Sequence, residues 1–187
     1  MSNSAVRIEE GAVVCDGAIL EGGDITIGPD TVVFPGALIR CSEGAGPVVI
    51  GRGCVLEESS IVECVDPGGL LVGEGNLFEV GCTVRALAVG DYNVFQPKCV
   101  VDRSVKVASG CSIGPKVSLR VSTILPNNVS LFRLDGYPDE YRMKSRPKNI
   151  EYNRARVNAY RTALASQGKK YYLGKYNKLL PATTEGA

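Results

Sequence analysis

The stretch VGDYNVFQPKCVVDRSVKVASGCSIGPKVSLRVSTILPNNVSL, residues 89–131, carries a bulky apolar residue at every sixth position. These residues are Val89, Phe95, Val101, Val107, Ile113, Leu119, Leu125 and Leu131. Neither a helix, with a period of about 3.6, nor a flat strand, with a period of about 2, produces a six-residue repeat. A hexapeptide β-helix does, because three short strands and their turns complete one triangular coil of about 18 residues. The stretch therefore predicts an all-β solenoid, a parallel β-helix of hexapeptide repeats.

The six-residue repeat continues toward the N-terminus when a few insertions are allowed. The further bulky residues that fit it are Ile8, Val14, Leu20, Ile27, Val33, Ile39, Ile50, Leu56, Val62, Val72, Phe78 and Val84. Two positions before most of the bulky residues stands a small or β-branched one: Ala12, Ala18, Thr31, Ala37, Cys54, Ser60, Cys82, Cys99, Cys111 and Thr123. Residues two apart on a strand face the same side, so both are expected to point into a narrow core of about six and a half coils.

Cysteine is frequent, with seven residues, and no two of them form a Cys-x-x-Cys pair. Four fall at the small inward positions of the repeat: Cys54, Cys82, Cys99 and Cys111. Free cysteine packs as a small apolar group, so buried and reduced thiols are expected. A metal or redox site is the alternative, although the inward cysteines are expected at scattered heights along the core.

Two gaps in the repeat have the composition of loops that leave the solenoid. The first, residues 40–49, contains SEGAGP, and the second, residues 63–71, contains DPGG. Glycine, proline and acidic residues are typical of turns out of regular structure. Both loops leave the same corner on successive coils, so we expect them to lie side by side. They are either tolerated insertions or a partner-contacting surface, with these candidate residues: Glu43, Pro47, Asp66 and Pro67.

The two ends of the β-helix are the second kind of candidate contact. Terminal coils leave backbone N–H and C=O groups unpaired, and such edges accept a strand from another chain. Val6 and Ile8 mark the first coil, and Leu131 and Phe132 mark the last. Six to seven coils at about 4.8 Å each give a rod roughly 30 Å long that suits end-to-end stacking.

Two Asn-x-Phe tripeptides, residues 76–78 and 93–95, occupy the same side of adjacent coils. We expect an inward pair of asparagines and a stack of phenylalanines. These side chains are predicted to pack the core and to form no binding pocket.

The repeat stops after Leu131, and the remaining chain has a different pattern. The segment DGYP at 135–138 predicts a turn, and the Arg146–Pro147 step predicts a boundary. Asn149 is expected to cap a helix that runs to about Ser166. The apolar stripe expected on this helix is Ile150, Val157, Tyr160 and Leu164.

The chain is therefore expected to divide into three parts. A β-helix is predicted over residues 5–134, and a helical segment over 135–180 that ends in a short amphipathic piece at 172–180. Residues 181–187 have the composition of a loose tail.

Charge is divided unevenly along the chain. Residues 1–138 hold 10 Lys and Arg against 16 Asp and Glu, a net charge of −6. Residues 141–178 hold 11 Lys and Arg and a single acidic residue, Glu151, a net charge of +10. We expect the helix to lie along the flank of the solenoid, where the opposite charges partly compensate. Binding of the basic segment to a microtubule, a nucleic acid or another acidic partner is the alternative.

Composition also bears on location. The 44% of hydrophobic residues is ordinary for a globular chain, and no apolar run reaches the length of a membrane span. The first ten residues lack the apolar core of a signal peptide. A cytosolic protein without membrane insertion is predicted.

The chain contains no histidine. Carbonic anhydrases of the γ type, one enzyme class on this fold, bind zinc through three histidines. Hexapeptide acyltransferases, the other common class, generally use a histidine as general base. Neither chemistry can run here in its usual form. The sequence therefore predicts a protein that is not an enzyme, with no catalytic residue, no metal and no cofactor.

Three segments carry a resemblance to a known family: GAGPVVIGRGCVLEESSIV at 44–62, VGEGNLFEVGC at 72–82 and VGDYNVFQPKCVVDRSVKVASGCSIGP at 89–115. In order and in loop position they resemble the dynactin subunit 6 family, the smaller β-helical subunits at the pointed end of dynactin. The likeness covers about residues 5–131. It implies a left-handed β-helix with a C-terminal α-helix, a handedness that the repeat alone leaves open.

The resemblance also implies partners. Members of this family pair with the other β-helical subunit, dynactin subunit 5, and together these join dynactin subunit 4 and the pointed-end actin-related protein. That assembly caps the actin-like filament and helps dynein engage cargo adaptors during microtubule-based transport. The resemblance thus implies a cytoplasmic, cytoskeleton-associated adaptor of the pointed-end complex that binds no nucleic acid. The alternative is a histidine-free relative of the γ-carbonic anhydrases or acyltransferases that forms its own homotrimer.

Overall fold

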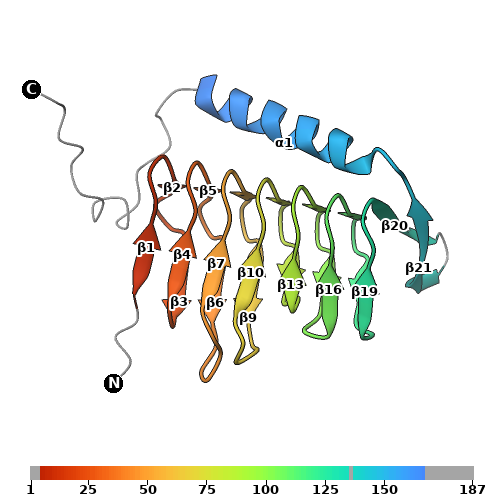
Figure 1. The fold of residues 1–187 in the computed structure, drawn as a ribbon, viewed down its shortest axis with the longest axis horizontal. Coiled ribbons are helices and arrows are strands. Elements are labelled where there is room, and N and C mark those ends of the chain that lie inside the picture. The colour runs from red at the N-terminus through yellow and green to blue at the C-terminus, as the bar shows by residue number, and fades with distance from the viewer. Residues whose placement is uncertain (1–4, 135–136, 167–187) are drawn as a thin grey trace, which may run out of the picture.

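The chain folds into a parallel β-solenoid followed by a single α-helix (Figure 1). The structure, a computed structural model, describes residues 5–134 and 137–166. Within these residues the solenoid makes about seven turns, and each of the first six contributes one short strand to each of three sheets. The sheets form the walls of a prism, here called walls A, B and C, and neighbouring coils pair in parallel.

Wall A has the strand order β1–β4–β7–β10–β13–β16–β19. Its strands are β1 (Val6–Ile8), β4 (Ile25–Ile27), β7 (Val48–Ile50), β10 (Leu70–Val72), β13 (Ala88–Val89), β16 (Val105–Val107) and β19 (Thr123–Leu125). Wall C has the order β18–β15–β12–β9–β6–β3. Its strands are β3 (Ile19–Gly22), β6 (Leu38–Cys41), β9 (Ile61–Cys64), β12 (Thr83–Val84), β15 (Val100–Val101) and β18 (Ser118–Leu119).

Wall B has the order β2–β5–β8–β11–β14–β17–β20–β21. Its strands are β2 (Val13–Val14), β5 (Val32–Val33), β8 (Val55–Leu56), β11 (Leu77–Phe78), β14 (Val94–Phe95), β17 (Ser112–Ile113), β20 (Val129–Leu134) and β21 (Tyr137–Ser145). The last pair, β20 with β21, is antiparallel, unlike the coil-to-coil pairs.

The core consists of the residues that the six-residue repeat predicts. All the bulky positions named above are buried, with at most 9% of any residue exposed, the value for Ile8. Phe78 and Phe95 stack as expected, with ring centroids 4.8 Å apart and planes inclined by 5°. The small inward partners are buried too, except Thr123, which is half-buried because β19 is the last strand of its sheet. The predicted repeat and coil number are confirmed.

The two inward asparagines form a hydrogen-bonded ladder between coils. The Asn76 amide group donates to the carbonyl oxygens of Gly73 and Gly90, both at 2.9 Å. Its Oδ1 accepts the backbone N–H of Asn93 at 2.9 Å, and Asn93 Oδ1 in turn accepts the N–H of Cys111 at 2.6 Å. These bonds satisfy backbone groups at a corner, where the chain turns between walls and strand pairing is interrupted.

The end of the solenoid differs from the expectation. After Leu134 the chain reverses, and β21 pairs with β20 from Val129 opposite Ser145 to Leu134 opposite Tyr137. Sequence reasoning missed this strand because its residues, YPDEYRMKS, are charged and contain a proline, which gives low β-propensity. The open edge of β20 provides backbone partners that override that propensity. The predicted boundary at Arg146 is confirmed, since β21 ends just before it.

The predicted helix is confirmed as α1 (Asn149–Ser166), which runs back along the solenoid (Figure 1). Its predicted cap is wrong. Asn128 Oδ1 accepts the N–H of Ile150 at 2.9 Å, whereas the Asn149 amide donates to the carbonyl of Gly110 at 2.6 Å. The capping side chain, Asn128, comes from the solenoid because the first turn of the helix packs against the turn that contains it. The amphipathic piece at 172–180 and the tail at 181–187 lie outside the described residues.

The asparagine ladder predicts a specific cost. Asn76→Ala removes the amide donor from the half-buried carbonyls of Gly73 and Gly90 and the acceptor from the buried N–H of Asn93, so we expect the free energy of unfolding to fall by about 2–4 kcal/mol. Asn127→Ala is the matched control, because that exposed side chain makes one hydrogen bond, to the N–H of Ser109. Its expected loss is below about 1 kcal/mol. Urea unfolding measures both, and equal losses would contradict a structural role of the ladder.

Candidate interaction surfaces

The outer face of wall B is apolar in its middle coils and is covered by α1. Val55, Leu77 and Val94 occupy equivalent outward positions on β8, β11 and β14. They form a buried cluster with Val157 of the helix, and Tyr160 packs against it. The expectation that the helix lies along the flank of the solenoid is confirmed. The side chain of Leu164 lies outside those described.

The same outward row becomes polar toward the C-terminus, and the helix changes with it. Ser112 follows Val94 in the row, and Asn149 Nδ2 donates to its Oγ at 3.0 Å. Asn153 Nδ2 donates to the carbonyl oxygens of Tyr92 and Cys111 at 2.9 and 3.0 Å. Both asparagines are 5% exposed. Sequence reasoning missed them as docking residues, although their spacing of four places them on the same helix face as Val157.

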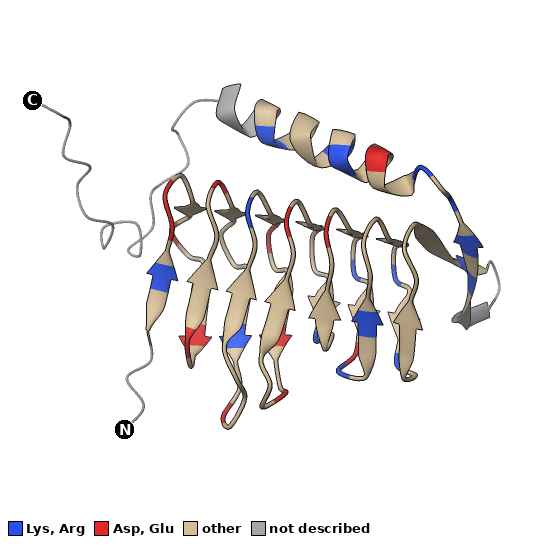
Figure 2. Ribbon diagram, viewed as in Figure 1, with Lys and Arg blue, Asp and Glu red and all other residues tan. Residues whose placement is uncertain are grey.

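Charge compensation between helix and solenoid is also confirmed. Residues 5–84 hold 3 Lys and Arg against 13 Asp and Glu, whereas residues 85–134 hold 7 against 2 (Figure 2). The helix runs back toward the acidic coils, where Arg156 pairs with Glu79 and Arg161 Nη2 lies 3.9 Å from Asp30 Oδ2. Burial raises the pKa of Glu79 above its ordinary value, and the Arg156 cation offsets part of this rise. The basic residues beyond 166 lie outside the described residues.

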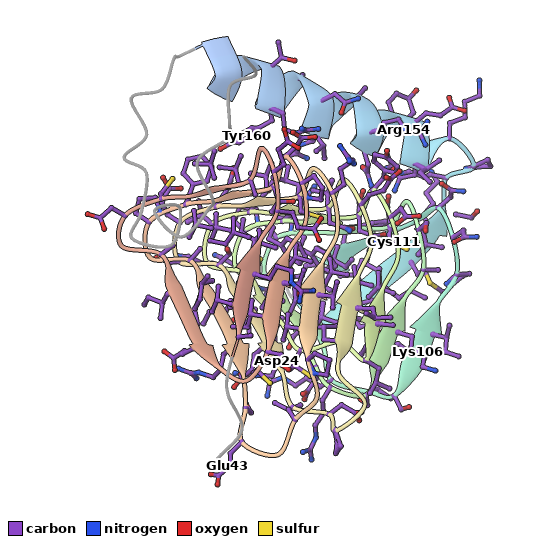
Figure 3. The ribbon with its side chains drawn as sticks, turned by 60° about the vertical axis from the view of Figure 1, so that its left-hand side comes forward. Asp24, Glu43, Lys106, Cys111, Arg154 and Tyr160 are labelled. Carbon is purple, nitrogen blue, oxygen red and sulfur yellow. The ribbon has the colours of Figure 1, made fainter. Side chains whose placement is uncertain are left out.

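The two loops predicted to lie side by side do so. The N–H of Gly46 donates to the carbonyl of Asp66 at 2.9 Å, and the N–H of Leu70 donates to that of Pro47 at 2.8 Å. Glu43 stands at the tip of the first loop and points away from the solenoid (Figure 3). The four candidate residues of the loops are exposed except for the half-buried Asp66: Glu43, Pro47, Asp66 and Pro67.

The two ends of the prism are closed to different degrees. β1, β2 and β3 each lie at the edge of a sheet, so three described strand edges are open at the N-terminal end. Val6 is half-buried there and Ile8 is buried. At the other end β18 and β19 are open, while β21 covers β20. Leu131 is buried at 2% exposed, whereas Phe132 is 40% exposed.

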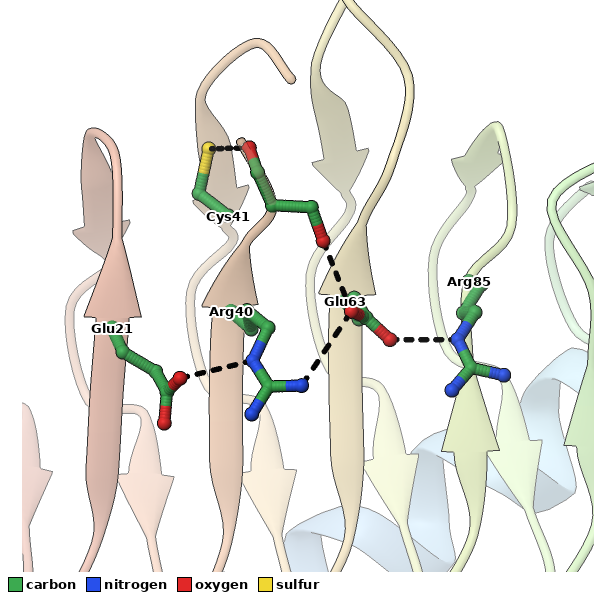
Figure 4. A network of polar contacts seen from close by, with 6 residues as sticks. Glu21, Arg40, Cys41, Glu63 and Arg85 are labelled. Atoms are coloured by element: carbon green, nitrogen blue, oxygen red, sulfur yellow. Dashed lines mark hydrogen bonds and ion pairs between the residues drawn. The ribbon is translucent and has the colours of Figure 1, made fainter. Parts of the chain in front are cut away.

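The outer face of wall C carries a row of charges that alternate in sign, one from each coil. The residues are Glu21, Arg40, Glu63, Arg85, Asp102 and Arg120. Figure 4 shows the paired part of this charge row. Arg40 Nε lies 3.0 Å from Glu21 Oε2, and Arg85 Nε lies 2.7 Å from Glu63 Oε2. Arg40 Nη1 also lies 3.7 Å from Glu63 Oε1, which links the contacts into one network.

A second outward row lies beside the charges on wall C and is mostly apolar. Its residues are Ile19, Leu38, Ile61, Thr83, Val100 and Ser118. Ile19 is 44% exposed and the others are half-buried. Sequence reasoning missed both rows because it followed only the inward positions. The signal was present, since a charge directly follows an inward residue such as Leu20, Ile39 or Val62.

The cysteine thiols are buried, and burial disfavours the ionised form of a thiol. All seven cysteines are free and buried, and the four predicted at inward positions are 0% exposed, which confirms their placement. Burial raises the pKa of Cys54 to about 12 and that of Cys111 to about 11, so both remain protonated at neutral pH. Among the described residues, no group of three or more Cys, Asp or Glu side chains is placed to hold a metal ion. No helix in this part of the chain is long and apolar enough to cross a bilayer.

A six-residue repeat wound into three parallel walls defines a hexapeptide-repeat β-helix protein. Two solved structures share the fold. A hexapeptide transferase family protein of Anaplasma phagocytophilum aligns with a TM-score of 0.66 at 16% identity, over 89% of this chain and 99% of that one. A putative acetyltransferase of Bacillus cereus aligns with a TM-score of 0.68 at 15% identity, over 89% and 95%. The fold is that of left-handed parallel β-helices, as the resemblance implied.

No family model matches the chain. Curated relatives do match: dynactin subunit 6 of Danio rerio is 38% identical over 140 residues, 68% of this chain and 70% of the relative. The Xenopus tropicalis protein of the same name is 38% identical over 141 residues, 70% and 69% of the two chains. That of Dictyostelium discoideum is 35% identical over 125 residues, 67% and 65%. The chain belongs to the dynactin subunit 6 family, which confirms the resemblance seen in its sequence.

Glu63 predicts how stability depends on pH. Burial alone would raise its pKa, but hydrogen bonds from Arg85 and Ser42 and the nearby cations outweigh burial and hold the pKa below its ordinary value. A lowered pKa stabilises the fold above the unfolded value of about 4.3, and this contribution is lost as pH falls through the folded pKa. We expect Glu63→Gln to lose about 1 kcal/mol at neutral pH, and the difference to shrink as the pH falls below about 4.3 toward the lowered pKa of the folded state. Thermal unfolding across this pH range tests it, and a constant difference would contradict it.

Proposed function

We propose that this protein is a non-enzymatic subunit of the dynactin pointed-end complex, cytoplasmic and associated with the cytoskeleton. In this role it supports dynein-driven transport along microtubules and the engagement of cargo adaptors. The observation that carries the proposal is the 38% identity to dynactin subunit 6 over 140 residues. The described solenoid has regular outer faces and open strand edges at its ends.

The absence of catalysis is supported by the chemistry of the side chains. The chain has no histidine to act as a general base at neutral pH. The two carboxylates buried most deeply, Glu63 and Glu79, are each engaged by an arginine. The inward thiols of Cys54 and Cys111 are held protonated by burial. The solved structures with the same fold are described as transferases, and at 15–16% identity they support only the fold.

The partners we propose are the β-helical dynactin subunit 5, dynactin subunit 4 and the pointed-end actin-related protein. Dynein and cargo adaptors would be reached indirectly through this assembly. We place the contact with the β-helical partner at the N-terminal end, because three described strand edges are open there. The loop residues Glu43 and Pro67, together with Phe132 at the other end, are further candidate contacts.

The hydrogen bonds of β1 suggest how the partner is held. The carbonyl of Ala5 accepts from Ile25, and the N–H of Glu9 donates to Ile27, so odd-numbered residues of this strand pair with β4. The N–H groups of Val6 and Ile8 therefore face the open edge. A strand or turn of another β-helix can accept them and continue wall A.

Proline substitution tests this contact, because proline removes the N–H donor. We expect Val6→Pro to weaken binding of dynactin subunit 5 about tenfold or more. Ile124→Pro is the matched control, because it lies on β19 at the opposite edge of the same wall. Co-purification and titration of the two chains measure the effect, with thermal unfolding as a check of each variant.

Three outcomes would count against the proposal in different ways. If the chain forms no complex with dynactin subunit 5, that protein is not its partner. If the chain instead forms a stable homotrimer that does not bind dynactin subunit 5, the carbonic-anhydrase-like or acyltransferase-like alternative is favoured. A loss caused by Ile124→Pro alone would move the contact to the C-terminal end. Full binding by both variants would mean that the contact is lateral.

A further inference from the structure

Wall C is an uncovered face with an unusual order of charges. The helix α1 packs on wall B, and no described element packs on the outer face of wall C. The charge row therefore faces outward over six coils in the order acidic, basic, acidic, basic, acidic, basic. The strands that carry it stand side by side (Figure 4), so successive charges are about one coil, or 4.8 Å, apart.

The charge row is paired at one end and not at the other. Glu21, Arg40, Glu63 and Arg85 form the linked network described above. Among the described residues, neither Asp102 nor Arg120 makes an ion pair. The Asp102 carboxylate accepts the backbone N–H of Arg103 at 2.7 Å, and Arg120 Nε donates to Ser118 Oγ at 2.9 Å.

The order of signs is self-complementary when the row is reversed. A second copy can be placed with its wall C against wall C of the first. The two copies are then related by a two-fold axis that runs parallel to the strands and passes between the third and fourth coils. The solenoid of the second copy runs in the opposite direction, and each row lies over the same row of the other copy. Glu63 then faces Arg85, Arg40 faces Asp102, and Glu21 faces Arg120, so every charge meets the opposite sign.

We propose that two copies of this chain associate through wall C in this antiparallel arrangement. Asp102 and Arg120, which make no ion pair with another described residue, each gain one from the second copy. The neighbouring row supplies apolar contacts at the same time, since Ile61 faces Thr83 and Leu38 faces Val100.

The charges also disfavour two neighbouring arrangements. If the two solenoids ran in the same direction with their charge rows superposed and unshifted, each charge would face its own copy, which is repulsive in every coil. A shift of the antiparallel pair by one coil would place Glu21 over Asp102 and Arg40 over Arg85, again with like signs. Like-charge juxtaposition disfavours both. Shifts that restore opposite signs leave some of the charges without a partner, so the unshifted antiparallel pair is the arrangement that pairs all six.

The size of the face indicates a weak dimer. Six coils and strands of about four residues make a surface of roughly 30 by 13 Å. Pairing two such faces buries about 800 Å², below the standard size of specific interfaces and in the range of weak, transient ones. We expect a dissociation constant of about 1–100 µM that rises with salt, since its ion pairs are solvent-exposed. The inference is independent of the dynactin role, because it concerns the free chain alone.

A charge swap between two chains tests the arrangement. Arg120→Glu places a carboxylate over Glu21 of the second copy, and Glu21→Arg places a guanidinium over Arg120, so each variant repels itself at two positions. We expect each variant alone to dimerise at least about tenfold more weakly than the wild type. A mixture of the two pairs opposite charges in every coil and is expected to recover the dimer. Sedimentation equilibrium of each chain and of the mixture measures this.

Two controls keep the result specific. Lys106→Glu makes the same change in charge as Arg120→Glu but lies on wall A, and it is expected to leave dimerisation unchanged. Unmutated chain is measured at about 50 mM and about 500 mM salt, where the dimer is expected to weaken at the higher value. This second measurement does not depend on the folding of any variant.

Several results would overturn the inference. If the wild-type chain stays monomeric at concentrations of a few hundred micromolar, the proposed dimer does not exist. A dimer that both single variants retain, or that strengthens with salt, would place the contact on another face. A mixture that stays monomeric while both variants remain folded would show that the charges do not face each other. Protection of wall C only when another β-helical protein is added would assign the face to that protein.

Discussion

The inward side chains of each triangular coil must together fill a narrow core, and the rest of the structure depends on this packing requirement. The bulky residue of each hexapeptide fills this core. On walls B and C the residue two positions earlier is mostly small, as Ala37 and Cys54 are, whereas on wall A it is itself bulky and buried, as Ile25 and Leu70 are. Side chains alternate along a strand, so a slip of one residue would turn the apolar set outward. The six-residue repeat is therefore a packing requirement and leaves no freedom of register within a wall.

The same constraint orders the outer surfaces. Each coil places an outward residue on each wall at an equal spacing, so residues far apart in sequence form straight rows. On wall B the row is apolar at Val55, Leu77 and Val94, and α1 covers it. On wall C the row alternates in charge, and no described element covers it. A protein of this build offers flat, evenly spaced faces and open strand edges, and these are the surfaces on which the proposed contacts depend.

The sequence predicted the inward half of the fold almost completely and the outward half poorly. Inward positions follow from local periodicity, which is why Val89 to Leu131 and the phenylalanine stack were found. Outward neighbours depend on how many residues each coil contains. Glu21 and Arg40 are 19 residues apart, whereas Glu63 and Arg85 are 22 apart, so no single period brings these charges together. Similarly, β21 and the docking asparagines depend on edges and carbonyls that exist only once the coils are stacked.

The central claim is that the register of inward side chains holds the solenoid together, and two matched insertions test it most directly. One alanine inserted between Lys98 and Cys99 shifts the repeat by a residue, whereas one inserted after Gly44 lengthens an exposed loop. Cooperative thermal unfolding of the two variants is the measurement. We predict that the first loses the cooperative transition or unfolds far below the wild type, while the second unfolds close to it. Equal behaviour of the two variants would contradict this claim.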